Sequence, residues 1–322
     1  MNVRRLIPGT ALAAATALGL TGLTACSGES TAAGNTDKFD VVASFYPMAF
    51  LAERIGGDHV KVSTLTEPGQ EPHDLEISAK QRVTVEEADA VLYLKDLQPS
   101  VDDTVAQSGV KTKIDAASLT TLEEHGTEVD GHADEHAEEE EEGHDHEEGG
   151  LDPHIWLDPV KYAEVAEGVG AAFEKADPDH AAAYKKNTAA LVTKLNALNT
   201  KFETGLADTE SKVFITTHAA FGYLAERYGL TEEAISGLDP ESEPTAARVK
   251  ELQTTAKADG VTTVFYETLV SDKTAKTLAQ DAGLKTDVLD PIEGITDKSR
   301  GDDYFAVQEA NLTALQTALG TK

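Results

Sequence analysis

The amino-acid sequence predicts an α/β fold with two lobes, each built on a parallel sheet, joined by one long rigid helix. Short apolar segments alternate with helix-like segments in both halves of the chain, which is the pattern of parallel strands covered by helices. A long uninterrupted helical pattern separates the halves. We therefore expect an N-terminal lobe at residues 39–176, a linking helix at 177–207 and a C-terminal lobe at 208–322.

Each half contains three segments with the short, apolar composition of buried strands, at residues 41–45, 60–65 and 90–94 and then at 213–217, 263–266 and 286–289. Helical segments lie between them and after them, at residues 47–55, 79–88, 245–258, 272–282 and 303–319. Because strands and helices alternate, the strands within each lobe are expected to run parallel.

The linking helix is predicted to begin at Asp177 and Pro178, which suit the N-cap and the first helical position. Apolar residues then follow at steps of three, four or seven and define one face: Tyr184, Leu191, Leu195, Leu198, Phe202 and Leu206. A helix of about 28 residues spans about 40 Å. We expect a rod between two lobes, which limits hinge motion; the alternative is one more packed helix of a single domain.

The N-terminus has the pattern of a lipoprotein signal peptide. Arg4 and Arg5 precede an apolar run over residues 6–25, and small residues lead to Cys26. We therefore expect residues 1–25 to be removed. A lipid on Cys26 would then anchor the chain to the cell membrane, on its extracytoplasmic face.

Composition restricts the remaining possibilities. Cys26 is the only cysteine, so a disulfide or a thiolate-based metal site is excluded and any metal must bind to His, Asp or Glu. The formal net charge of −31 argues against nucleic acid as a partner and favours cationic ligands. Residues 26–38 are rich in small polar residues and predict a flexible tether.

Residues 123–150 form a histidine-rich acidic segment. It contains five histidines among many carboxylates and lacks large apolar residues beyond Val129; the histidines are His125, His132, His136, His144 and His146. Such a composition predicts a disordered loop. Histidine-rich tracts associate with metals weakly and collectively, whereas a plain acidic solvated loop is the alternative.

Three other histidines lie in loops of a different kind. His73 follows the strand that ends at Leu65, and His218 directly follows the strand at 213–217. His154 is flanked by prolines that fix its backbone. Asp290 also follows a predicted strand. Open α/β sheets bind ligands at the carboxyl ends of their strands, so these four side chains are candidates for one site.

Three neutral imidazoles and one carboxylate suit Zn²⁺ in tetrahedral geometry. Mn²⁺ is a harder ion that prefers more oxygen ligands and is the less favoured cargo. Because histidine ligands must be neutral, metal affinity is expected to fall below about pH 6. His59 and His180 lie outside these loops and are expected to take no part.

Together these motifs resemble the cluster A-I solute-binding proteins, the zinc- and manganese-binding lipoproteins of ABC uptake systems. The resemblance covers nearly the whole chain. Besides the signal peptide and the histidine-rich insertion, it is carried by Glu71-Pro72-His73, residues 152–159, His218 to Tyr223, Arg227 to Leu230, Val270 to Thr274 and Leu289 to Gly294.

The resemblance implies two Rossmann-like lobes joined by a long helix, with the metal in the cleft between them. It implies that His73, His154 and His218 are ligands. The fourth ligand is expected to be Asp290, with Glu293, Glu71 or water as alternatives. His218 at the third position, where manganese members tend to carry Glu, favours zinc. The implied partner is an ABC permease in the membrane, and the chain is expected to be a monomer.

The two alternative functions are a zinc enzyme and a metal buffer or surface adhesin. A zinc enzyme needs an open coordination position and a general base, for which Glu71 is available, but there is no His-Glu-x-x-His pattern and no evident Ser/His/Asp set. A metal buffer or surface adhesin would not need three ordered histidine loops. We therefore expect no enzyme, but an extracytoplasmic zinc-binding protein that delivers metal to an ABC transporter.

Overall fold

The computed structural model describes residues 38–126 and 150–321. The predicted signal peptide, all but the last residue of the tether and residues 127–149 lie outside the described residues. Within the described ranges, no helix has the length and apolar character needed to cross a membrane.

The first sheet has four parallel strands in the order β2-β1-β3-β4: β1 (Phe39–Ala43), β2 (Val60–Thr64), β3 (Ala90–Tyr93) and β4 (Thr112–Asp115). Its helices are α1 (Tyr46–Gly56), α2 (Ala79–Glu87) and α3 (Pro99–Gln107). Apolar side chains of α2 and α3 pack with Val42 and Val91 of the strands, whereas α1 covers the opposite face with Met48 and Leu51. Both faces are therefore buried, which explains the continuous apolar strands.

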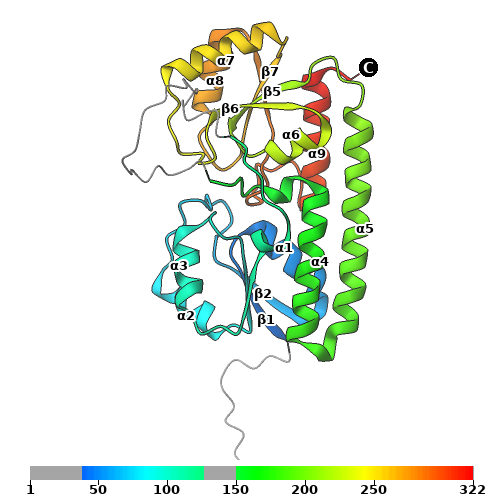
Figure 1. Ribbon diagram of the computed structural model, residues 1–322. Helices are drawn as coiled ribbons and strands as arrows, with labels where there is room; N and C mark the ends of the chain where they lie inside the picture. The colour runs from blue at the N-terminus through cyan, green and yellow to red at the C-terminus, as the bar shows by residue number, and fades with distance from the viewer. Residues whose placement is uncertain (1–37, 127–149, 322) are drawn as a thin grey trace, which may run out of the picture. The chain divides into compact units, whose positions relative to one another are not determined.

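The second sheet repeats this arrangement in the order β6-β5-β7-β8: β5 (Val213–His218), β6 (Thr231–Ser236), β7 (Thr263–Tyr266) and β8 (Lys285–Val288). Its helices are α6 (Gly222–Tyr228), α7 (Ala246–Ala258), α8 (Lys273–Ala282) and α9 (Tyr304–Leu319). Helices α7 and α8 pack on one face of this sheet, and α9 packs on the other (Figure 1).

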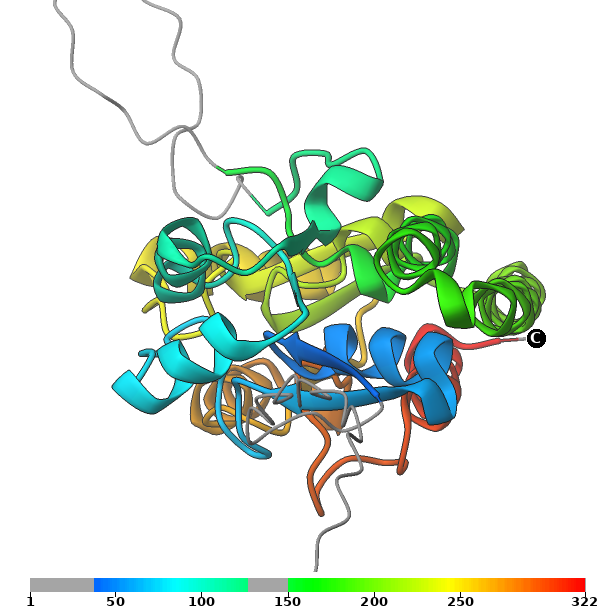
Figure 2. The ribbon, with the colours of Figure 1, turned by 90° about the horizontal axis from the view of Figure 1, so that it is seen from below.

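Two long helices, α4 (Pro159–Ala176) and α5 (Ala181–Leu206), lie side by side along the molecule (Figure 2). Helix α5 contacts α1 and α4 of the first lobe and α9 of the second. All six predicted face residues of α5, from Tyr184 to Leu206, are buried. The predicted fold class, two parallel-sheet α/β lobes joined by a long helix, is confirmed.

The linking helix begins three residues later than the sequence pattern predicts. Residues Pro178–His180 form a 3-10 turn, and the α-helix starts at Ala181. The Asp177 carboxylate does not cap the helix, because it accepts a hydrogen bond from the Tyr184 hydroxyl at 2.5 Å and contacts His180 Nδ1 at 2.8 Å.

The two lobes are also joined by buried hydrogen bonds around Trp156. The indole N–H of Trp156 donates to the Pro291 carbonyl oxygen at 2.6 Å, and the Tyr304 hydroxyl donates to the Trp156 carbonyl oxygen at 2.6 Å. Arg227 of α6 pairs with Asp158, the N-cap of α4, at 2.6 Å. One hydrophobic cluster runs through both lobes, so the segments between the sheets are held in fixed positions.

Candidate metal centre

Four side chains from both lobes converge between the two sheets. His73 lies in the loop after β2, and His154 precedes a short 3-10 turn at Ile155–Leu157. His218 is the last residue of β5, and Glu293 lies in the loop after β8. Each offers one ligand atom to a group whose atoms all lie within 4.8 Å of one another.

Four of the six distances within this group are close to the edges of a coordination tetrahedron. Glu293 Oε1 lies 3.3 Å from His73 Nε2 and 3.6 Å from Nε2 of both His154 and His218. The Nε2 atoms of His154 and His218 are 3.4 Å apart. Zinc–nitrogen bonds of about 2.0–2.1 Å at tetrahedral angles would separate neighbouring ligand atoms by about 3.3–3.4 Å.

Burial and charge act against each other in this group. Burial alone would raise the pKa of Glu293, but its hydrogen bonds to the three histidines hold that pKa well below the usual range. Burial alone would lower the pKa of His218, but Glu267 and Glu293 raise it well above its ordinary value. The pKa of His154 is likewise raised by Asp152 and Glu293 against the effect of burial. The raised pKa values of His154 and His218 therefore favour their protonated forms beside the buried carboxylate when no metal is bound.

Two buried carboxylates fix the orientation of the imidazoles. Asp152 Oδ1 lies 2.8 Å from His154 Nδ1, and Glu267 Oε1 lies 2.9 Å from His218 Nδ1. Each contact places the proton on Nδ1 and leaves Nε2 free to bind a metal. Carboxylates in this position also make the imidazole a stronger donor to the metal.

Asp290, the expected fourth ligand, lies outside the group, and Glu293 occupies its place. The Asp290 carboxylate accepts hydrogen bonds from Ile292 N at 2.8 Å and from the Thr268 hydroxyl at 3.2 Å. Ile292 has φ of 59°, a left-handed conformation that is strained for a β-branched residue. Asp290 therefore stabilises the turn that directs Glu293 toward the histidines.

The two remaining expectations for this region have different outcomes. Glu71, an alternative ligand, is outside the group of four, although burial and the nearby Glu293 raise its pKa to about 7. Residues 123–126 and 150, which were expected to be part of a disordered loop, have defined positions, and the rest of that segment lies outside the described residues. His125 bonds to Asp152 and Glu226, which are distant in sequence, so local composition could not reveal its order.

Comparison with known proteins decides the family. The profile of the ZnuA family, described as "Zinc-uptake complex component A periplasmic", matches residues 41–318. The chain belongs to this family. The expectation that the chain is not an enzyme agrees with its membership of this family, because the family is described by zinc uptake and not by a reaction.

Two proteins with similar sequences have names that refer to zinc. The zinc-binding lipoprotein AdcA of Streptococcus pneumoniae is 39% identical over 300 residues, 91% of this chain and 58% of that protein. The chain therefore spans just over half the length of this relative. The high-affinity zinc uptake system protein ZnuA of Bacillus subtilis is 35% identical over 310 residues, 93% of this chain and 95% of that protein.

A solved structure shows the same architecture. The Zn(II)-bound ZnuA-like domain of Streptococcus pneumoniae AdcA superposes with a TM-score of 0.70 at 34% identity, covering 88% of this chain and 99% of that one.

Proposed function

We propose that this protein is an extracytoplasmic zinc-binding protein that delivers its ion to an ABC importer. The observation that carries the proposal is the convergence of three imidazole Nε2 atoms and one carboxylate oxygen, from both lobes, at tetrahedral spacing. The names of its relatives support zinc as cargo. Anchoring through a lipid on Cys26, a permease partner and a monomeric state complete the proposal.

The site suits capture better than catalysis. His154, His218 and Glu293 are each at most 1% exposed, and only His73 is partly accessible. Four protein side chains fill the tetrahedral positions, whereas a catalytic zinc keeps one position open for water or substrate. Because His73 is the one partly exposed member of this group, we propose that the ion enters and leaves at the side of the first lobe.

Zinc should be preferred over manganese because the group offers three nitrogens and a single carboxylate. We expect competitive titration of the mature chain at neutral pH to show one tightly bound Zn²⁺ that an excess of Mn²⁺ does not displace. Displacement by Mn²⁺ at comparable concentration would leave the family intact but refute the proposed cargo.

We propose Glu293, and not Asp290, as the fourth ligand. Glu293→Gln removes the anionic ligand and should weaken zinc binding about 10- to 100-fold, because a hydrogen bond or contact to a charged group is worth about 1.5–3 kcal/mol. Asp290→Asn retains an oxygen that can accept from Ile292 N–H, so its effect should stay within about fivefold. Equal losses in both variants, measured by chelator competition, would contradict this assignment.

A further inference from the structure

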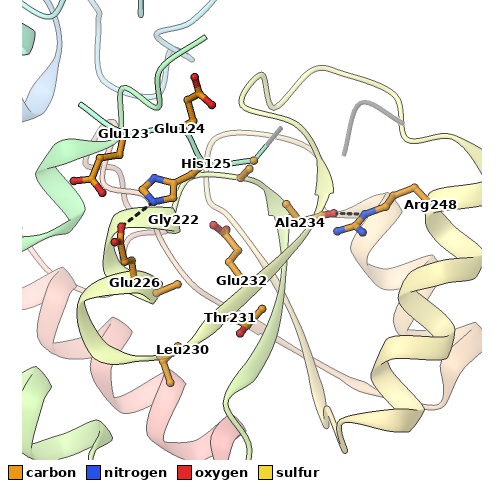
Figure 3. Close-up of a pocket in the computed structure, with 13 residues that line it drawn as sticks. Glu123, Glu124, His125, Gly222, Glu226, Leu230, Thr231, Glu232, Ala234 and Arg248 are labelled. Atoms are coloured by element: carbon orange, nitrogen blue, oxygen red, sulfur yellow. Dashed lines mark hydrogen bonds and ion pairs between the residues drawn. The ribbon is translucent and has the colours of Figure 1, made fainter. Parts of the chain in front are cut away.

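A second group of potential metal ligands lies at the base of the histidine-rich segment. His125, Glu123 and Glu226 each offer one atom, and these atoms lie within 4.8 Å of one another. His125 Nε2 is 3.1 Å from Glu226 Oε2, close to the edge of about 3.3 Å expected for a tetrahedral zinc site. Figure 3 shows the carboxylates of Glu123 and Glu226 on the same side of the His125 ring, with the Glu124 carboxylate pointing away from it.

The His125 ring is oriented by a carboxylate outside this group. Asp152, which is fully buried, places Oδ2 3.0 Å from His125 Nδ1. This contact puts the proton on Nδ1 and turns Nε2 toward Glu226. The carboxylate–imidazole pair found behind zinc ligands has this arrangement, and it appears here just as it does behind His154.

The backbone just before His125 is also fixed. Glu123 N donates to the Tyr223 hydroxyl at 2.8 Å, and Asp152 N donates to the Glu123 carbonyl oxygen at 2.9 Å. The His125 ring packs edge-on against Tyr223 at 4.5 Å. A Cβ atom at Gly222 would lie 2.5 Å from His125, so glycine at this position makes room for the ring.

The surroundings are negatively charged and open. The group lines a cavity of about 520 Å³, and the Glu226 side chain is 61% exposed. Lys161 pairs with Glu123 Oε1 at 2.6 Å. With His125 neutral, the carboxylates of Glu123, Glu226 and Asp152 exceed the Lys161 ammonium by two charges, which a divalent cation would balance.

We propose that Glu123, His125 and Glu226 form a second, solvent-accessible zinc site, with water completing the coordination. Its three protein ligands and its exposure predict weaker, faster-exchanging binding than at the buried centre. Asp152 touches both His125 and His154, through different oxygens, so one carboxylate supports a ligand of each site. The second site does not depend on which ligands hold the buried ion.

The test is zinc stoichiometry of the mature chain in a background that lacks the other histidines of the segment, namely a variant with alanine at positions 132, 136, 144 and 146. We expect two zinc ions per chain, one tight and one at least tenfold weaker. Glu226→Gln and His125→Ala should each weaken the second ion at least tenfold. Glu124→Gln is the matched control, because it removes the same charge from a neighbouring residue outside the group and should leave the second ion bound.

Two further measurements make the outcome decisive. The affinity of the tight ion, measured by chelator competition, should be unchanged in Glu226→Gln, which shows that the variant is folded. Anomalous diffraction at the zinc edge should place the second ion about 2.0–2.1 Å from His125 Nε2. The proposal is overturned by a single zinc ion in the background variant, by a second ion that persists in Glu226→Gln, or by equal losses in Glu226→Gln and Glu124→Gln.

Discussion

Replacement of His218 by alanine is expected to weaken zinc binding by about 100- to 1,000-fold. Structural zinc sites with four ligands bind with about 10–16 kcal/mol, so one lost ligand costs about 3–4 kcal/mol. His218 is at the end of β5 and is 1% exposed, so no neighbouring side chain can move in freely to replace it. The variant would also leave Glu293 with fewer partners in a buried position.

The measurement is competition with a chelator strong enough to exclude weak binding by the histidine-rich segment. His180→Ala is the matched control. His180 lies in the 3-10 turn before α5, where its ring stacks on His59 at 4.2 Å, and it is outside both ligand groups. We expect its zinc affinity to equal that of the unmodified chain. A loss of less than tenfold in His218→Ala would show that the metal binds elsewhere.

Two of the three histidines could be predicted from topology, and His154 from the prolines that flank it. Residues that follow parallel strands gather at one edge of a sheet, and His73 and His218 both have this position. The choice between Asp290 and Glu293 could not be made in this way. They are three residues apart in one loop, and the positive φ of Ile292 decides which carboxylate faces the histidines. No propensity rule anticipates that conformation at an isoleucine.

Some elements of the fold could likewise be predicted from the sequence, and others could not. Helix α5 was predicted because its apolar residues keep a helical period over the whole length and are buried on one face. Strands β4 and β6 were not predicted. Each is at the edge of its sheet and has polar, partly exposed residues: Thr112 and Lys113 in β4, and Thr231 and Glu232 in β6. Their pairing depends on the neighbouring strand and not on their own composition.

Zinc affinity is expected to depend on pH, and this dependence should extend to higher pH than it would for histidines with an ordinary pKa. Zinc must displace the protons from His154 and His218, whose pKa values are raised in the metal-free protein. Proton competition therefore begins above the ordinary histidine pKa of about 6.5, and not only below pH 6 as the sequence alone suggested. Each displaced proton changes the apparent affinity tenfold per pH unit, so about 10- to 100-fold per unit is expected for one or two protons.

The same groups set the pH dependence of stability without metal. Because their folded-state pKa values are raised, His154 and His218 stabilise the metal-free fold below pH 6.5, and this contribution is lost as the pH rises through the raised values. Glu293, with a lowered pKa, stabilises the fold above pH 4.5, and its contribution is lost as the pH falls through the lowered value. Metal-free stability from this group is therefore greatest at about pH 4.5–6.5.

Zinc replaces the protons as the partner of Glu293, so the rise in Tm on adding zinc should be small near pH 5 and should grow steadily toward pH 8. Scanning calorimetry with and without saturating zinc, at half-unit steps of pH, measures both curves. His218→Ala supplies the comparison, because it removes one titrating ligand and should flatten the pH dependence. A zinc-induced shift that is constant from pH 8 to 5 would mean that no histidine proton is displaced, which is incompatible with binding by three imidazoles.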